Sequence, residues 1–392
     1  MISIEEIRTR ESFEALRPEW RTLIESEPDS SPFDAPSWYA CCLAAEPGRP
    51  LSLLAARQSG ALVGIAPWWE GRARVRGIEA RTVGFISNRE TPRSGFVVRA
   101  EVRDRVVEEF LRHARTAWRA RWDILSLAPW PVDAPDRAAF ERIATSRGCV
   151  LHRSRASLVP TIGITASWDD FLAGKSYLFR KSRRGILNRM SRVPDVTVER
   201  HRHAPGPRLL EELADVSRRG WKHRDGVSLA AREDSLRFFA ALNEAADAEG
   251  WLDVWMLRFA GVPVAFEYDL LHADVVHALR AEFDEAHERL SPGAYLEYFI
   301  LKAAFDEGRR RYSCGPGLDA YKLRWTEELH ETTIVRIYGP TPAGRWLEFL
   351  EARALPALRR VRDRLRPRER GRESASGDPA AETAPTAEED RP

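Results

Sequence analysis

The sequence predicts an α/β fold arranged as two domains of similar size. The chain has 392 residues, which is more than a single domain usually holds. Short apolar strand patterns alternate with amphipathic helical patterns in both halves. In addition, residues 54–66 align by eye with residues 255–267, and the offset (255 − 54 = 201) is the size of a domain rather than of a short repeat. We therefore expect a structural duplication.

The first half begins with a hairpin pattern. Two apolar runs at 51–57 and 62–69 flank Ser59-Gly60, and glycine at such a position favours a tight turn. The elements expected next are a helix, a buried strand and a second helix, at 103–120, 123–127 and 136–146. The polar loop 87–92 lies between the hairpin and the first of these helices, and we expect it to close over a cleft between the domains.

The second half repeats this pattern. Three strands are expected, at 251–259, 263–271 and 274–282, and Ala260-Gly261 is the turn of the first pair. A helix that begins near Pro207 is expected to end at the Trp-Lys-His-Arg run 221–224.

The segment 172–192 is expected to form one basic helix. Its cations are Lys175, Arg180, Lys181, Arg183, Arg184, Arg189 and Arg192. Like charges on one helix usually form a solvated face, and we favour that interpretation. The same charges could instead hold an anionic substrate or a nucleic acid.

The C-terminal region changes character twice. Residues 345–366 predict an amphipathic basic helix that Pro356 would kink. Packing across the body of the protein is the favoured interpretation, and peripheral contact with an anionic membrane is the alternative. Beyond residue 372 the small, acidic composition predicts a disordered tail. The expected domains are 1–155, 156–340, a helix at 341–371 and a tail at 372–392.

Composition narrows the classes of function. The net charge of +2 gives no general argument for nucleic acid, and no partnership with DNA is expected. The acidic start of the chain does not resemble a secretion signal, and no apolar run reaches the ~18 residues that would span a bilayer. The four cysteines have no zinc or redox spacing, and no His/Cys/acid cluster has metal-ligand spacing. A cytoplasmic protein without a metal is therefore expected.

A predicted helix that begins after Ser291 carries the clearest binding signal. Ser291 is a favoured N-cap residue, and Pro292 suits the first helical position, where no N–H group is needed. The free backbone N–H groups of Gly293, Ala294 and Tyr295 would then face an anion. This helix start is the candidate anchor for the phosphates of a ligand.

Two carboxylates provide the candidate base. Glu267 and Asp269 lie two residues apart on a predicted strand, so both should project from one face. Neighbouring carboxylates among apolar residues can hold one raised pKa, which suits a general base. Glu267 is favoured because it follows the most apolar part of the strand. An exposed strand face would carry acids for solubility just as readily.

Several of these features together resemble a known family. They are the run 264–269, the pair Phe283-Asp284, the start Ser291-Pro292-Gly293, the glycines 315 and 317, the pair Tyr321-Lys322, and Trp325. The pattern resembles the BioF2-like, or CelD-like, acyltransferases of the GNAT superfamily, which are similar to the FemAB peptidyltransferases. The resemblance covers roughly residues 154–338. It implies two tandem GNAT-like domains, each with a mixed, mostly antiparallel sheet flanked by helices.

The resemblance also implies roles for particular residues. Acetyl-CoA or another acyl-CoA would be the co-substrate, anchored at residues 291–295. Lys322 would contact a phosphate of the donor or the acceptor, and Tyr321 would protonate the departing thiolate. The residues implied to line the acceptor cleft are Trp221, Lys222, Asp284 and Trp325, although a tryptophan such as Trp325 is more often part of a core. Cys314 is a weak candidate nucleophile because no histidine lies near it in the sequence.

Two positions depart from the family pattern. Arg289 stands four residues before Gly293, whereas the usual phosphate loop has a basic or amide residue three before its glycine. Ser313 occupies a position where relatives tend to have an aspartate, two residues before Gly315.

The sequence therefore supports three hypotheses about function. The first is an N-acyltransferase that moves an acyl group from acyl-CoA to an amine of a small molecule or glycan precursor, in envelope or exopolysaccharide biosynthesis. The second is an aminoacyl-tRNA-dependent peptidyltransferase. The duplication and the basic segment 172–192 support this hypothesis. The third is a non-catalytic scaffold of polysaccharide assembly, which rests on Ser313 and on the basic helix at 345–366.

Overall fold

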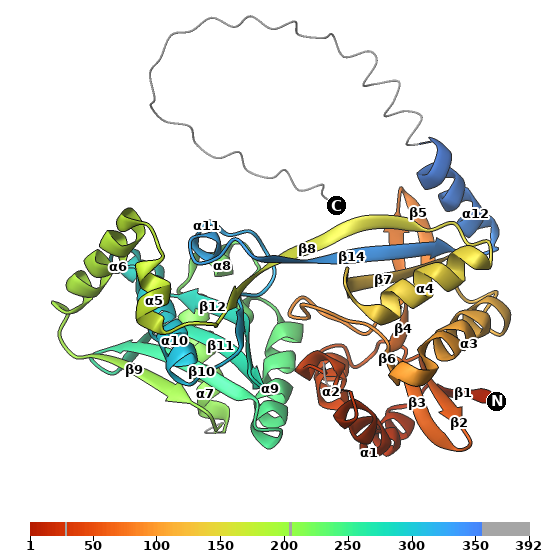
Figure 1. Cartoon of the computed structure of the whole chain (residues 1–392), viewed down its shortest axis with the longest axis horizontal. Coiled ribbons are helices and arrows are strands. Elements are labelled where there is room, and N and C mark those ends of the chain that lie inside the picture. Colours follow the sequence, from red (N-terminus) through yellow and green to blue (C-terminus); the bar gives the residue numbers. More distant parts are fainter. Residues whose placement is uncertain (28–29, 204–205, 355–392) are drawn as a thin grey trace, which may run out of the picture.

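The computed structural model describes residues 1–27, 30–203 and 206–354. It consists of two lobes, one mainly red to yellow and the other mainly green to blue, and two long strands run side by side from one lobe to the other (Figure 1). The elements of the first half are β1 (Ile2–Ile7), α1 (Arg10–Glu25), α2 (Pro36–Ala45), β2 (Leu53–Gln58), β3 (Ala61–Ala66), β4 (Trp68–Val75), β5 (Ile78–Phe85), β6 (Val97–Val98), α3 (Arg103–Thr116), β7 (Ile124–Pro131), α4 (Pro135–Ser146) and β8 (His152–Gly163).

The second half begins after β8 with two helices and ends with a strand and a helix. Its elements are α5 (Trp168–Ala173), α6 (Tyr177–Met190), β9 (Val196–His201), α7 (Pro207–Arg218), α8 (Trp221–Arg224), α9 (Glu233–Ala248), β10 (Leu252–Phe259), β11 (Val262–His272), β12 (Val275–Phe283), the 3₁₀ helix η4 (Glu285–Leu290), α10 (Pro292–Asp306), β13 (Arg311–Ser313), α11 (Ala320–Leu323), β14 (Leu329–Tyr338), α12 (Pro342–Phe349) and the π-helical turn η5 (Leu350–Ala354).

The two halves repeat one order of elements. A four-stranded sheet in the order β1-β2-β3-β6 is matched by the run β9-β10-β11-β12 in the second half. Each half has its hairpin at the predicted turn, where Ser59-Gly60 and Ala260-Gly261 all have positive φ. Helix α3 follows β6 as α10 follows β12. The predicted α/β class and the predicted structural duplication are confirmed.

A ten-stranded sheet joins the halves. Its order is β4-β5-β7-β14-β8-β13-β12-β11-β10-β9. Strand β14, which belongs to the second half of the sequence, lies between β7 and β8 and pairs with both in antiparallel fashion. The long strands β8 and β14 are the two that connect the lobes in Figure 1. A cut between residues 155 and 156, the predicted domain boundary, would fall inside β8.

The hydrophobic core is also continuous between the halves. One cluster of buried side chains contains residues of α1 and α2 together with residues of α7, α9 and β11. Within it, the Trp38 ring meets the Phe238 ring edge-on at 5.2 Å between centroids. Separate clusters fill the rest of the first half and the space under α10.

Two predicted helices are each divided in the structure. The single basic helix expected at 172–192 is instead two helices, α5 and α6. Ser176 is the N-cap of α6, since its hydroxyl oxygen accepts a hydrogen bond from the N–H of Phe179, and a new helix therefore begins there. Helix α7 ends at Arg218, and Trp221–Arg224 form the separate α8. The chain turns at Gly220, where a Cβ atom would lie 2.9 Å from the carbonyl oxygen of Phe283.

Two further predicted elements, a strand and the C-terminal helix, differ from the structure or extend beyond the residues that it describes. The strand expected at 62–69 is two strands, β3 and β4, with Pro67 between them. Of the helix expected at 345–366, the structure describes the part up to Ala354 as α12 and η5. Pro356, the rest of that helix and the tail at 372–392 lie outside the described residues.

Candidate active site

The sheet splits between β12 and β13. These strands pair in parallel at only three positions, from Val275 opposite Arg311 to His277 opposite Ser313. The chain then turns toward β8, where the N–H of Cys314 donates to the carbonyl of Pro160 (2.9 Å). Beyond His277, the facing edge of β12 therefore has no strand partner among the described residues. A strand edge of this kind leaves backbone groups free to bind an extended ligand.

The strand that borders the split carries a β-bulge. Asp269 on β11 pairs with Ala278 on β12, but the next pair is Tyr268 with Arg280, so Leu279 is the extra residue. Across the split, Gly315 has φ +73°, and a Cβ atom there would lie 2.7 Å from the carbonyl oxygen of Ala278. Glycine is required at this position because the two backbones approach so closely.

Two buried carboxyl groups lie beneath α10, next to the split. Glu267 is 7% exposed, and its Oε1 accepts a hydrogen bond from the hydroxyl of Tyr312 on β13. Asp269 is fully buried, and neither of its carboxyl oxygens has a hydrogen-bond partner among the described residues. Burial raises the pKa of Glu267, whereas the Tyr312 hydroxyl and the Lys322 charge lower it. Burial, with Glu267 nearby, holds the pKa of Asp269 well above its ordinary value.

A third carboxyl group reaches the same region from α10. Glu297 is buried, and burial raises its pKa to about 8. Its Oε2 lies 3.7 Å from the guanidinium of Arg183 on α6, which is also buried. A carboxyl group with a pKa near neutrality can hold or release a proton under physiological conditions.

Lys322 lies in the site and also fastens the loop that precedes it. The ammonium donates to the carbonyl of Pro316 (2.7 Å) and to that of Gly315 (3.4 Å), and it pairs with Asp319 (3.1 Å). The side chain is buried, and its positive charge is one of the causes that lower the pKa of Glu267. The neighbouring Tyr321 is 42% exposed, and its ring centroid lies 5.8 Å from the lysine ammonium.

A second lysine approaches the open strand edge from α8. Lys222 donates a hydrogen bond to the carbonyl of Ala281 on β12 (2.9 Å). Burial lowers its pKa, as expected for an ammonium removed from water. The exposed Trp221 ring lies 5.8 Å from the same ammonium. The structure thus brings the predicted pair Trp221 and Lys222 to the edge of the split.

Asp284 and Trp325, which were predicted to contact the substrate, instead contact other residues of the protein. Asp284 accepts hydrogen bonds from Arg219 (2.7 Å) and from the N–H of Ala286 (3.0 Å), so its carboxylate caps η4. Trp325 is buried among the aromatic rings of α5 and α6, of which Phe179 is the nearest at 4.7 Å between centroids. The core role that is common for tryptophan therefore describes Trp325 better.

The start of α10 differs in detail from the expected cap. Helix α10 begins at Pro292, but Ser291 is in the left-handed region (φ 57°) and its side chain caps nothing. The reason is that its N–H closes η4 by donating to the carbonyl of Glu288. No described residue accepts a hydrogen bond from the N–H of Gly293 or Ala294, so these donors are available to an anion. The prediction for Tyr295 is wrong, because its N–H donates to the carbonyl of Ser291 (3.0 Å) and is not available to a ligand.

Comparison with known proteins agrees with this geometry. A family model described as an acetyltransferase (GNAT) domain matches residues 180–323. This segment is therefore similar to a GNAT acetyltransferase domain. The match contains the split, the buried carboxyl groups, both lysines and the start of α10. No curated protein matches the chain.

Solved structures share the fold of most of the chain at low identity. The crystal structure of FemX has a TM-score of 0.56 at 13% identity, over 84% of this chain and 96% of that one. The C-terminal domain of a putative lysylphosphatidylglycerol synthetase from Agrobacterium fabrum has a TM-score of 0.53 at 14% identity, over 88% of this chain and 97% of its own. L-PGS from Bacillus licheniformis also scores 0.53, at 12% identity, over 88% and 96%. Identities this low indicate a shared fold only.

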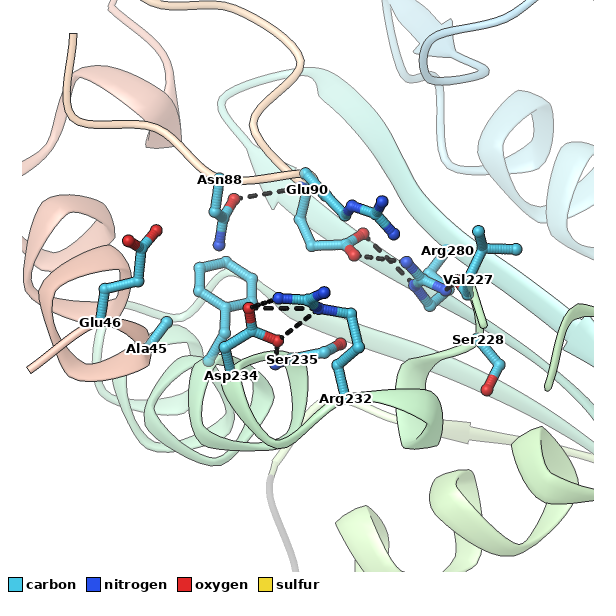
Figure 2. A pocket seen from close by; sticks show the side chains of 12 residues that line it. Ala45, Glu46, Asn88, Glu90, Val227, Ser228, Arg232, Asp234, Ser235 and Arg280 are labelled. Carbon is cyan, nitrogen blue, oxygen red and sulfur yellow. Dashed lines mark hydrogen bonds and ion pairs between the residues drawn. The ribbon is translucent and has the colours of Figure 1, made fainter. Parts of the chain in front are cut away.

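A small pocket lies where the GNAT domain meets the first half. Figure 2 shows Asn88 and Glu90 of the loop 87–92 facing Arg280 of β12 and the start of α9. Glu90 and Arg280 form a buried ion pair across this boundary, and Arg280 also pairs with Glu282 (2.7 Å). The cavity is only about 40 Å³, enough for a few water molecules. The loop expected to close over the cleft thus contacts the second half directly.

Tyr312 and Glu297 were not predicted from the sequence, and Arg183 was named only as one of the cations of the segment 172–192. Tyr312 binds Glu267, Glu297 adds a carboxyl group, and Arg183 pairs with Glu297. A signal was present for Glu297, which interrupts the apolar face formed by its neighbours in α10. For Tyr312 the available signal was its spacing from Cys314. The two residues are two apart, and side chains with that spacing share one face of a strand.

The described residues were also considered as a place for a metal ion or a membrane-spanning helix. No group of three or more potential metal ligands is found within residues 1–27, 30–203 and 206–354. In the same residues, no helix combines the length and the apolar character needed to cross a bilayer.

Proposed function

We propose that this protein is an N-acyltransferase that moves an acyl group, in the simplest case acetyl, from acyl-CoA to an amine. The observation that carries the proposal is the position of Glu267. Its carboxyl group is buried beside the split between β12 and β13, bound by Tyr312 and close to Lys322, inside the segment that matches the acetyltransferase domain. A base with a raised pKa next to an open strand edge suits the attack of an amine on a thioester.

Three features would position the donor. The extended arm of CoA would run along the unpaired edge of β12, as an added strand. Its diphosphate would accept hydrogen bonds from the N–H groups of Gly293 and Ala294 at the start of α10. The backbone N–H at the Leu279 bulge would face the thioester carbonyl and stabilise the oxyanion.

The transfer itself needs one base and one acid. The acceptor amine attacks the carbonyl carbon, the C–N bond forms, and Glu267 takes the proton that the nitrogen loses. The tetrahedral oxyanion then collapses, the C–S bond breaks, and the CoA thiolate receives a proton from Tyr321. The phenol regains a proton from solvent, because burial raises its pKa and favours the protonated form. The ammonium groups of Lys322 and Lys222 favour the charged form of Glu267, since both lower its pKa.

The acceptor is proposed to be a primary amine of a small molecule or a glycan precursor, used in envelope or exopolysaccharide biosynthesis. It would approach past Lys222 and Trp221, from the side of the boundary between the halves. A cytoplasmic location fits this proposal, because Cys41, Cys42, Cys149 and Cys314 are all free thiols.

Calorimetric titration with acetyl-CoA, with free CoA as the control, tests the donor. We expect one-to-one binding with a dissociation constant in the micromolar range, as is common for enzyme substrates. Absence of binding to both compounds would overturn the proposal.

A second candidate is transfer from an aminoacyl-tRNA, in the manner of the FemAB group. The observations in its favour are the fold shared with FemX and the exposed arginines of α6. Its test is binding of tRNA at several salt concentrations, because contacts to phosphates make affinity fall steeply with salt. The scaffold hypothesis remains a prediction that rests on Ser313, which pairs with His277 in the sheet.

A further inference from the structure

An arginine-lined pocket lies between α5, α6 and α10. Its volume is about 420 Å³, which is within the range of small-molecule sites. Helix α6 contributes Arg180, Arg183 and Arg184, and the opposite walls contain Asp169 and Leu172 of α5 and Tyr298 of α10. Arg183 is paired with Glu297, so Arg180 and Arg184 against Asp169 give the pocket its net positive charge. An anion is therefore the ligand that the lining favours.

Arg183 is the buried element of this pocket. The residue is 5% exposed, yet its Nε has no hydrogen-bond partner among the described residues. The rings of Phe179 and Trp325 hold the guanidinium in place, at 5.1 and 5.4 Å. A buried donor without an acceptor costs free energy, so this position is prepared for an acceptor that a ligand would supply.

The other two arginines differ in how firmly they are held. Arg180 donates to the carbonyl groups of Ala173 (2.5 Å) and Lys175 (2.6 Å), which fixes it at the junction of α5 and α6. Arg184 is exposed and makes no ion pair or hydrogen bond with the residues described here. A planar guanidinium with free N–H groups matches the geometry of a phosphate.

We propose that this pocket binds the 3′-phosphoadenosine end of the CoA donor, an inference that rests on the proposed function. Arg183 connects the pocket to the start of α10, because its guanidinium lies 3.5 Å from the carbonyl of Ala294. The diphosphate is proposed to bind at that helix start, and the phosphorylated nucleoside is the next group along CoA. Leu172 and Tyr298 supply apolar surface for the adenine, and Arg184 binds the 3′-phosphate.

The test compares CoA with 3′-dephospho-CoA, which differs only in that phosphate. Dissociation constants of both are measured by calorimetry for the wild-type protein, for Arg184→Gln and for Arg189→Gln. Arg189 is an exposed arginine of the same helix that does not line the pocket, so its variant controls for the loss of charge. Arg184 is chosen over Arg183 because an exposed side chain can be replaced without disturbing the fold.

The wild-type protein is expected to bind CoA roughly tenfold more tightly than 3′-dephospho-CoA, as for one charge-assisted contact. Arg184→Gln is expected to abolish this preference and Arg189→Gln to retain it. Equal affinity for the two compounds in the wild type would overturn the pocket assignment while leaving the donor intact. Binding of neither compound would overturn both proposals. If Arg184→Gln weakened tRNA binding and left the preference for CoA unchanged, the pocket assignment would also fall.

Discussion

At the scale of residues, the central feature is that three buried carboxyl groups share one region. Glu267 and Asp269 project from β11, and Glu297 projects toward them from α10. Burial raises the pKa of each. The Tyr312 hydroxyl and two lysine charges oppose this rise at Glu267, whereas arginine charges oppose it at Asp269 and Glu297. The pKa of Asp269 nevertheless stays well above its ordinary value and that of Glu297 is about 8, so the surroundings favour the protonated form most strongly at Asp269.

Replacement of Glu267 tests its role as base. Glu267→Gln is expected to lower kcat by roughly 100-fold or more, since general bases commonly contribute that much. Affinity for acetyl-CoA should remain within about threefold of the wild type, because the amide keeps the shape of the side chain. Steady-state rates of thiol release measure the effect, and Glu211→Gln on the exposed face of α7 is the control. Unchanged kcat would remove Glu267 from the chemistry.

The pH dependence of stability reports on Glu297. Its pKa is about 8 in the folded protein and 4.5 in the unfolded chain, so the folded state binds the extra proton between these values. Stability contributed by the neutral form is therefore lost as the pH rises from about 4.5 to 8. Glu297→Gln cannot ionise, so its free energy of unfolding should exceed that of the wild type by a margin that grows across this window. Urea denaturation at pH 5, 7 and 9 measures the margin, and a constant difference would contradict the assignment.

The structural role of Lys322 can be tested separately from its role in the reaction. Its ammonium binds two carbonyl groups of the loop at 315–317, so Lys322→Met should lower the free energy of unfolding by about 2 kcal/mol. Asp319→Asn removes only the exposed partner and should cost less than about 1 kcal/mol. Urea midpoints and transfer rates are compared for both variants. Full stability of Lys322→Met with loss of transfer would mean that the lysine acts only in the reaction.

At the scale of elements, the close approach of two backbones sets the width of the split. Gly315 and Gly308 both have positive φ, but a Cβ atom meets the Ala278 carbonyl at the first position and open space at the second. Backbone strain at positive φ should lower the free energy of unfolding of both alanine variants by about 1 kcal/mol. Gly315→Ala should cost at least about 1 kcal/mol more and weaken acetyl-CoA binding. Thermal unfolding and calorimetry measure these effects, and equal losses in the two variants would show that the close approach is unimportant.

Elements were predictable from the sequence where the signal is local. The hairpin turns at Ser59-Gly60 and Ala260-Gly261 and the start of α10 at Pro292 all depend on a few adjacent residues. The gap between α5 and α6 was missed because the basic pattern continues through it, and only the cap at Ser176 reveals the break. The left-handed Ser291 was missed because η4 before it has no sequence signature that we recognised.

The candidate site was predictable only in part, for a similar reason. Glu267, Asp269 and Lys322 stand in recognisable local patterns, and the structure gathers them. Tyr312 and Arg183 come from a three-residue strand and from a helix outside the expected motifs. Their contacts depend on how β13 and α6 pack against β11 and α10, which spacing along the chain does not encode.

At the scale of the whole molecule, the two halves share a sheet and a core. We therefore expect one cooperative unfolding transition, with tryptophan fluorescence and far-ultraviolet circular dichroism giving the same midpoint in urea. Fragments divided between residues 155 and 156 should each fail to fold, because the cut interrupts β8 and separates β7 from β14. Two separate transitions, or a folded fragment, would instead show that the halves are independent.

The position of β14 has a consequence for synthesis on the ribosome. Strands β7 and β8 do not pair with each other, and β14 fills the space between them. Ile124 pairs with Tyr338, which is added 214 residues later (338 − 124 = 214). At translation rates of about 5–20 residues per second, the nascent chain waits roughly 10–40 s for this strand. The first half is thus made first but completes its sheet last, and in the meantime its open strand edges need protection from aggregation.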